Sequence, residues 1–162
     1  MTTRRYPIGI QTFSRIRREG YVYVDKTDLV WQMAHDADLA MREMQTFLAG
    51  VPYVEGFKKK LESVAVAEGF YEYTMYLIFT MLNFYVHTQV KVAGGRADMV
   101  VWMPDTTYVF ELKVNGTAQQ ALAQIDQNSY AIPYQAEGRR VVKVGVKFIA
   151  DTRVPEEWVV AE

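Results

Sequence analysis

The stretch "GGRADMVVWMPDTTYVFELKV", residues 94–114, decides the fold, because it contains two apolar strand patterns separated by a turn. Pro104-Asp105 is the predicted turn between them. Successive side chains of a strand point to opposite faces, so Glu111 and Lys113 are neighbours on one surface of an otherwise apolar strand. Buried charges are rarely tolerated without a functional reason. The charged pair on this apolar strand therefore indicates a functional site.

The pattern on both sides of this hairpin predicts an α/β domain. A crossover helix between two strands favours a parallel arrangement, so we expect the last long strand to lie parallel to a central one. Thr117 is a predicted N-cap for that helix. The predicted elements, in chain order, are a helical region at 55–82, strands at 84–92, 96–103 and 107–114, a helix at 118–132, a strand at 139–149 and a short edge strand at "EEWVV".

Residues 1–54 are predicted to form a separate N-terminal region. Residues 1–28 are interrupted by proline and glycine and alternate at "YVYVD", a pattern typical of an extended arm. From Lys26 to about Ala49, apolar residues recur at spacings near three and four, which predicts a helix. We therefore expect two regions, an arm and helix at 1–54 and a compact domain at 55–162.

Composition excludes several classes of protein. With 162 residues, half of them hydrophobic, the chain has material for one well-buried core. The formal net charge is −1, so no global positive field indicates a polyanionic partner. No cysteine occurs, which excludes a disulfide scaffold and thiolate metal sites. No signal peptide or membrane-spanning run is found, and we expect a cytoplasmic protein without a membrane partner.

Asp98 adds a second carboxylate to the pair on the third strand. A hairpin that places residue 101 opposite residue 108 also places Asp98 opposite Glu111. Two like charges on one face repel, and a hard divalent cation such as Mg²⁺ is the simplest compensation. Two carboxylates, a cation and Lys113 suit hydrolysis of a phosphodiester. The alternative, a solvated strand face with a weak surface ion pair, is disfavoured by the apolar neighbours.

The region from about Glu68 to Phe148 resembles the PD-(D/E)XK nuclease superfamily, which carries an Asp on its second core strand and Glu-x-Lys on its third. More narrowly, "GGRADMVVWMPDTTYVFELKVNGTAQQALAQIDQNSYAIPY" is similar to the C-terminal nuclease-like domain of a bacterial AAA-ATPase-like family. The stretch "YPIGIQTFSRIRREGYVYVDKTDLV" resembles the opening of that family's ATPase-like region. The resemblance implies a restriction-endonuclease-like α/β core of helix, three-stranded meander, helix and strand. Its mixed sheet is flanked by helices, and residues 1–54 are a remnant of the ATPase-like region.

Carried to this sequence, the resemblance implies that Asp98 and Glu111 bind Mg²⁺ or Mn²⁺ and that Lys113 is the catalytic lysine. Glu68 corresponds to the acidic residue on the first core helix, which helps to hold the metal or a water. Glu72, one turn later, is the competing choice for that role.

Three further residues are candidates for contact with the substrate. Gln124 and Tyr130 match a glutamine and a tyrosine that, in related nucleases, contact the active site or a backbone phosphate. Without the resemblance, they would be interpreted as an exposed helix residue and a packing aromatic. Arg96 lies two residues before Asp98, so strand alternation puts it on the same face, where it can contact a phosphate. The aromatics of "NFYV" favour a core or subunit interface over a base-stacking platform.

The sequence departs from the family in two respects. Gln89 stands where a glutamate is usual, which removes a negative charge and weakens or retunes metal binding. No G-x-x-x-x-G-K-[ST] motif occurs, so we expect no ATP hydrolysis. The chain resembles a version of the family that kept both ends and lost the ATPase region.

The function favoured by these observations is a metal-dependent nuclease acting on nucleic acid, with DNA favoured over RNA. The alternative is a catalytically inactive remnant of the fold that binds nucleic acid or a protein, which Gln89 and the lost ATPase region favour. A purely structural oligomerisation module is a third hypothesis, and the sequence leaves open whether the protein is a homodimer.

Overall fold

The computed structural model describes residues 18, 31–33, 35–51, 64–149 and 154–162. Residues 32–162 form one compact unit, to which everything below refers. The arm predicted at 1–28 and the boundary predicted between residues 54 and 55 lie outside the described residues, apart from Arg18 of the arm.

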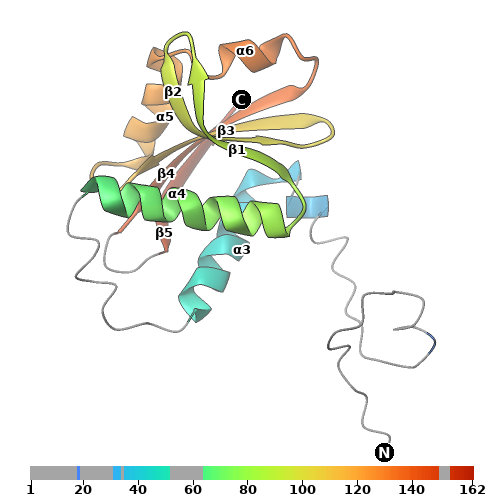
Figure 1. The fold of residues 1–162 in the computed structure, drawn as a ribbon, viewed down its shortest axis with the longest axis vertical. Coiled ribbons are helices and arrows are strands. Elements are labelled where there is room, and N and C mark those ends of the chain that lie inside the picture. Colours follow the sequence, from blue (N-terminus) through green and yellow to red (C-terminus); the bar gives the residue numbers. More distant parts are fainter. Residues whose placement is uncertain (1–17, 19–30, 34, 52–63, 150–153) are drawn as a thin grey trace, which may run out of the picture. The chain divides into compact units, whose positions relative to one another are not determined.

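In the described part of this unit, five strands form one mixed sheet in the order β1-β2-β3-β4-β5 (Figure 1). The strands β3 and β4 run parallel, and the other neighbouring pairs are antiparallel. The elements are α3 (Ala37–Gly50), α4 (Val64–Met81), β1 (Tyr85–Val92), β2 (Gly95–Trp102), β3 (Thr106–Lys113), α5 (Ala118–Gln127), α6 (Ile132–Gln135), β4 (Arg140–Phe148) and β5 (Pro155–Ala161).

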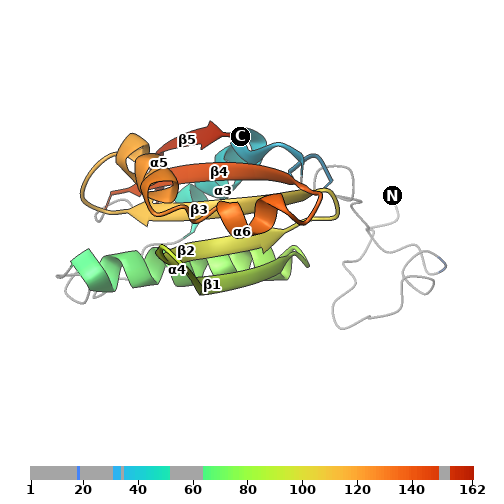
Figure 2. The same cartoon turned by 90° about the horizontal axis from the view of Figure 1, so that it is seen from above.

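Helices cover both faces of the sheet. Figures 1 and 2 show α3 and α4 on one face and α5 and α6 on the other. Alternate residues of the strands divide accordingly: Met99 and Phe110 join the core beneath α3 and α4, whereas Val100 and Val109 join the core beneath α5. Because both of its faces are covered, the central strand β3 is buried along nearly its whole length.

The predicted topology is confirmed. Val101 lies opposite Tyr108, which is the register expected for the β2–β3 hairpin, and β4 runs parallel to β3 as the crossover helix requires. Thr117 caps α5 in a reciprocal arrangement: its hydroxyl accepts from the Gln120 N–H at 3.1 Å, and the Gln120 side chain accepts from the Thr117 N–H at 3.0 Å. The restriction-endonuclease-like fold class follows from this order and register.

The helix after β3 differs from the prediction, because it ends at Gln127 instead of continuing to residue 132. Ser129 adopts a left-handed backbone with φ 56°, and the Asn128 amide donates to the Tyr130 hydroxyl at 2.9 Å. A left-handed residue interrupts a right-handed helix, and the bond from Asn128 holds the Tyr130 side chain in the turn that follows. Tyr130 therefore lies in a turn, where it is buried, and Pro133 lies in the first turn of the short helix α6, where proline is tolerated.

Gly145 of β4 allows α5 to lie directly on the sheet. A Cβ atom at this position would stand 2.2 Å from the Ala118 carbonyl oxygen and 2.5 Å from the Leu122 nitrogen. The substitution Gly145→Ala is therefore expected to lower the free energy of unfolding by about 2 kcal/mol or more, because backbone atoms must move. Chemical denaturation measures this. Gly69→Ala in α4 is the control, since its Cβ would meet nothing within 4 Å; equal loss in both variants would contradict the close approach.

Candidate active site

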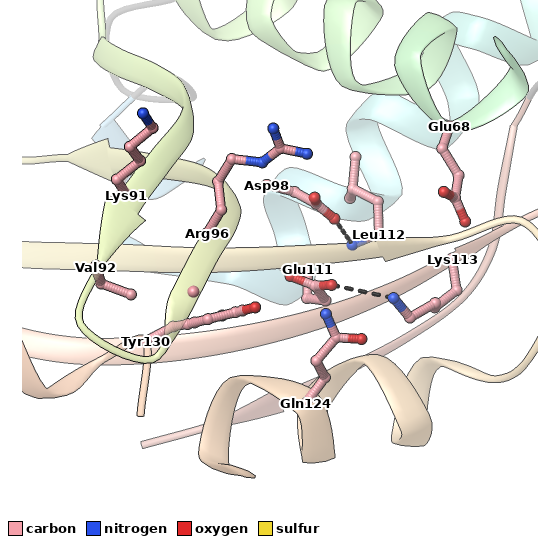
Figure 3. A pocket seen from close by; sticks show the side chains of 11 residues that line it. Glu68, Lys91, Val92, Arg96, Asp98, Glu111, Leu112, Lys113, Gln124 and Tyr130 are labelled. Carbon is pink, nitrogen blue, oxygen red and sulfur yellow. Dashed lines mark hydrogen bonds and ion pairs between the residues drawn. The ribbon is translucent and has the colours of Figure 1, made fainter. Parts of the chain in front are cut away.

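The site lies where β2 and β3 part. The two strands pair from Trp102 opposite Thr107 to Met99 opposite Phe110. At the next step the Asp98 carboxylate, and not a β2 carbonyl, accepts the Leu112 N–H at 2.8 Å (Figure 3). The observed register is the predicted one, but the paired stretch ends at Met99 and Phe110, one residue before Asp98 and Glu111, where the strands separate.

Glu111 is a carboxylate buried inside the sheet, with 2% of its surface exposed. Its Oε1 accepts from the Lys113 Nζ at 3.1 Å. Its Oε2 is buried and has no hydrogen-bond partner among the described residues. Buried polar atoms are almost always paired, so this oxygen is a position that a proton, a water or a cation can satisfy.

The electrostatics of the two carboxylates agree with this. Burial, and after it the nearby charge of Asp98, raise the pKa of Glu111 to about 7 against the opposing effect of Lys113. Burial also raises the pKa of Asp98, while its hydrogen bond from the Leu112 N–H and the Lys113 charge lower it. Both groups therefore carry negative charge at a cost, which a cation between them would relieve.

A cavity of about 630 Å³ opens beside this pair, and we call it the Asp98 cavity. It brings residues from both helical layers to one place: Glu68 comes from α4 and Gln124 from α5 (Figure 3). The seven residues predicted as catalytic, metal-binding or nucleic-acid contacts all line it, namely Glu68, Arg96, Asp98, Glu111, Lys113, Gln124 and Tyr130.

Glu72 lies in an adjoining hollow of about 360 Å³, together with Gln89 and not with Glu111. The Gln89 amide donates to the Glu72 carboxylate. Burial raises the pKa of Glu72, and this hydrogen bond opposes the shift. Of the two competing acidic residues, Glu68 is the one that shares a cavity with Glu111 and Lys113. Gln89 is engaged with Glu72, a bond that a glutamate at position 89 could make only by sharing a proton.

Lys91 is a cavity residue that the sequence reasoning missed. It lies directly opposite Arg96 on the β1–β2 hairpin, so two cations face each other. Both side chains are exposed, and neither has an ion pair among the described residues. The sequence could have predicted this pair, because the residue numbers 91 and 96 have the same sum as those of the other facing pairs in this hairpin, such as 87 and 100. Like charges directly opposite each other destabilise a hairpin unless an anion is bound between them.

The donor set of the Asp98 cavity fits a hard cation with oxygen ligands. Within the described ranges, no three Asp, Glu, His or Cys side chains are close enough together to form a complete metal site. Asp98 and Glu111 would thus hold an ion together with backbone carbonyls or water, which Mg²⁺ accepts readily. The unpaired Oε2 of Glu111 is the observation in favour of this fit.

The fold and site together define a restriction-endonuclease-like α/β domain with two carboxylates and a lysine where β2 and β3 separate. Residues 66–158 match the model of the PD-(D/E)XK nuclease superfamily, and residues 7–42 match that of a predicted AAA-ATPase family. The first match covers more than half of the chain, and the protein therefore belongs to the PD-(D/E)XK nuclease superfamily, as the sequence motifs indicated.

A relative from Azotobacter chroococcum mcd 1, described as an uncharacterized protein in the vnfD 5' region, is 31% identical over 142 residues. The alignment covers 86% of this chain but 26% of the relative, so the chain spans about a quarter of that protein's length. No solved structure matches the chain. In the described residues, no helix is both long enough and apolar enough to cross a membrane.

The raised pKa of Glu111 makes the stability of the domain depend on pH. Because the folded state holds this proton up to about pH 7 and the unfolded chain releases it near 4.5, stability falls as pH rises through that window. Glu111→Gln removes this contribution. In chelator-treated buffer the variant should gain about 3 kcal/mol relative to wild type between pH 4.5 and 8, measured by denaturant unfolding. Glu137→Gln, at an exposed turn, is the control, and parallel pH profiles for wild type and Glu111→Gln would refute the shift.

Proposed function

We propose that this domain is a nuclease that hydrolyses phosphodiester bonds of nucleic acid, DNA in preference to RNA, with Mg²⁺ or Mn²⁺. The observation that carries the proposal is the unpaired, buried oxygen of Glu111, which lines one cavity with Asp98 and Lys113. Bound there, a divalent ion would neutralise phosphoryl oxygens and lower the pKa of an attacking water.

The side chains of the cavity divide the remaining tasks. Lys113 is held beside Glu111 by their 3.1 Å ion pair, so its ammonium is positioned to donate to charge that develops on a phosphoryl oxygen. Glu68 enters from α4 and can accept a hydrogen bond from the attacking water. Gln124 and Tyr130 supply an amide and a hydroxyl that can orient a phosphate.

Lys91 and Arg96 would contact the nucleic-acid backbone at the rim of the cavity. They are exposed and form no salt bridge among the described residues, so a phosphate between them would offset their mutual repulsion. The charge of Arg96 also acts on Asp98 and Glu72, where it opposes the rise in the pKa of each carboxyl. The overall charge of −1 gives no general attraction for nucleic acid. Binding would therefore depend on this local pair.

A catalytically inactive domain that binds nucleic acid is the second candidate. The observation in its favour is that no complete set of three acidic, histidine or cysteine ligands is grouped within the described residues. A two-carboxylate site binds a cation more weakly, and such a domain would retain the phosphate contacts without cleaving.

Metal binding and cleavage separate these candidates. Titration calorimetry with Mg²⁺ and Mn²⁺ should give binding heat for the wild type and none for Asp98→Ala. A plasmid-nicking assay should show cleavage by the wild type only, with a loss of about 100-fold or more in Asp98→Ala. Equal binding heats in both proteins would contradict the proposed metal site. Metal binding without nicking would favour the catalytically inactive domain.

Lys113→Ala should reduce nicking about 100-fold while metal binding persists, because Lys113 stabilises charge but does not hold the ion. Lys147→Ala is the matched control. Lys147 is the register partner of Lys113 on β4, but its ion pair is with Glu156 and it does not line the cavity. Equal loss in both lysine variants would contradict the assigned role.

Lys91→Ala and Arg96→Ala should each weaken DNA binding and reduce the slope of log affinity against log salt by about 0.9. Fluorescence anisotropy with an Asp98→Asn background and a labelled duplex measures this without cleavage. Lys143→Ala is the control, since its Nζ is paired with Asp126 at 2.9 Å outside the cavity. An unchanged slope in the first two variants would exclude a phosphate contact there.

A further inference from the structure

Another hollow, of about 500 Å³, lies apart from the Asp98 cavity and shares no lining residue with it or with the hollow at Glu72. It is lined by Tyr85, Trp102, Glu137 and Arg139, and we call it the Tyr85 recess. Tyr85 begins β1 and is the register partner of Trp102, which ends β2. Glu137 and Arg139 lie in the turn between α6 and β4.

The aromatic side of the recess is a group of rings in mutual contact. Tyr85 is 62% exposed, and its ring centroid is 4.8 Å from that of His87 and 5.3 Å from that of Trp102. His87 lies edge-on to Trp102 at 5.2 Å, and the buried Tyr134 lies edge-on to Trp102 at 5.8 Å. Rings that restrain one another lose little conformational freedom when a further ring stacks on them. The exposure of Tyr85 contradicts the core role expected for the "NFYV" aromatics, and the subunit-interface alternative stays a prediction.

The polar side of the recess presents one acceptor group and one donor group. Glu137 and Arg139 are joined by a 3.0 Å ion pair and are 37% and 38% exposed, so oxygens and N–H groups of both remain accessible. A carboxylate only accepts hydrogen bonds and a guanidinium only donates them. A ligand that satisfies both needs donors and acceptors on one edge. A phosphate does not meet this requirement, because Glu137 would repel it.

A flat ring with such an edge is a nucleobase, and guanine matches the pair best. Its N1–H and exocyclic amine can donate to Glu137, while O6 and N7 can accept from Arg139, as they do from arginine in duplex grooves. Base stacking on aromatic side chains is a common basis of single-strand binding. We propose that the Tyr85 recess binds a guanine base by stacking on the exposed Tyr85 ring, with the tilted Trp102 ring beside it, and by contacts of its edge with Glu137 and Arg139.

The position of the recess connects it with the Asp98 cavity. Asp98 and Trp102 are four residues apart on β2, a distance of about 13 Å, and Trp102 packs against the same core as Tyr130 and Ile125. A strand whose phosphate lies at Asp98 could therefore reach the recess within a few nucleotides. In this respect the inference rests on the proposed function and extends it to a base preference near the cleaved bond, although base binding itself requires no metal.

The test measures base preference without cleavage. Asp98→Asn protein in chelator is titrated with labelled hexanucleotides of thymidine that carry either one internal guanine or none, and anisotropy is recorded. The guanine strand should bind about 10-fold more tightly. Tyr85→Ala should remove most of that gain and Tyr85→Phe should restore it, while Glu137→Gln should abolish the preference for guanine without weakening the thymidine strand. Tyr73→Ala, an equally exposed tyrosine on α4, is the control.

Competition with free GMP distinguishes the two sources of the base. If free GMP displaces the labelled hexanucleotide, a free nucleotide is a sufficient ligand. If only guanine-containing strands displace it, the ligand is the nucleic-acid strand. Both outcomes support a guanine recess. Equal affinity for the two hexanucleotides, or a preference untouched by Tyr85→Ala and Glu137→Gln, would overturn the inference. A wild-type protein that prefers guanine but does not nick DNA would refute the proposed nuclease activity and support the guanine recess. A wild-type protein that nicks DNA without any preference for guanine would support the nuclease activity and refute the recess.

Discussion

The hydrogen bond from the Leu112 N–H to the Asp98 carboxylate is the interaction on which the site depends. A strand that leaves a sheet exposes backbone donors, and a buried donor without a partner is costly. Asp98 satisfies that donor with a side chain, so β2 can separate from β3 without losing the bond. The separation opens the space that becomes the Asp98 cavity. The same carboxylate faces that space, so one residue both permits the opening and supplies its charge.

The β1–β2 hairpin is held in this separated position by its own tip. A Cβ at Gly94 would overlap the Asn128 carbonyl oxygen at 1.8 Å, so the hairpin backbone lies directly against the end of α5. Tyr130 packs beside Gly95 in the same turn. On the opposite side, Gln89 takes a left-handed backbone with φ 54° and bonds to Glu72 of α4. The hairpin is thereby fixed to a helix of each layer, and the width of the cavity is fixed with it.

Much of this could be predicted from the sequence, because it depends on strict alternation and on local turn chemistry. The register of β2 and β3, the parallel β4 and the cap at Thr117 all follow from residues close in sequence. The end of α5 did not follow, since tertiary packing of Tyr130 overrides a helical pattern that continues past Gln127. The bond between Gln89 and Glu72 was equally hidden, because a single left-handed residue in a strand changes where its side chain points and leaves no periodic signal.

Burial of Glu111 has a thermodynamic consequence that reaches beyond its immediate neighbours. A buried carboxylate opposes folding whenever it is ionised, and at Gly145, the register partner of Glu111, the close contact of α5 covers the neighbouring strand. A site built for stability alone would place an apolar residue here, as at the neighbouring positions of β3. Protonation and the ion pair with Lys113 reduce the cost of this charge, and under the proposed function a bound cation would offset it further, because a ligand that binds only the folded state stabilises it more as its affinity increases. If the proposed ion binds, fold stability and metal affinity would be linked through one oxygen atom, the unpaired Oε2 of Glu111.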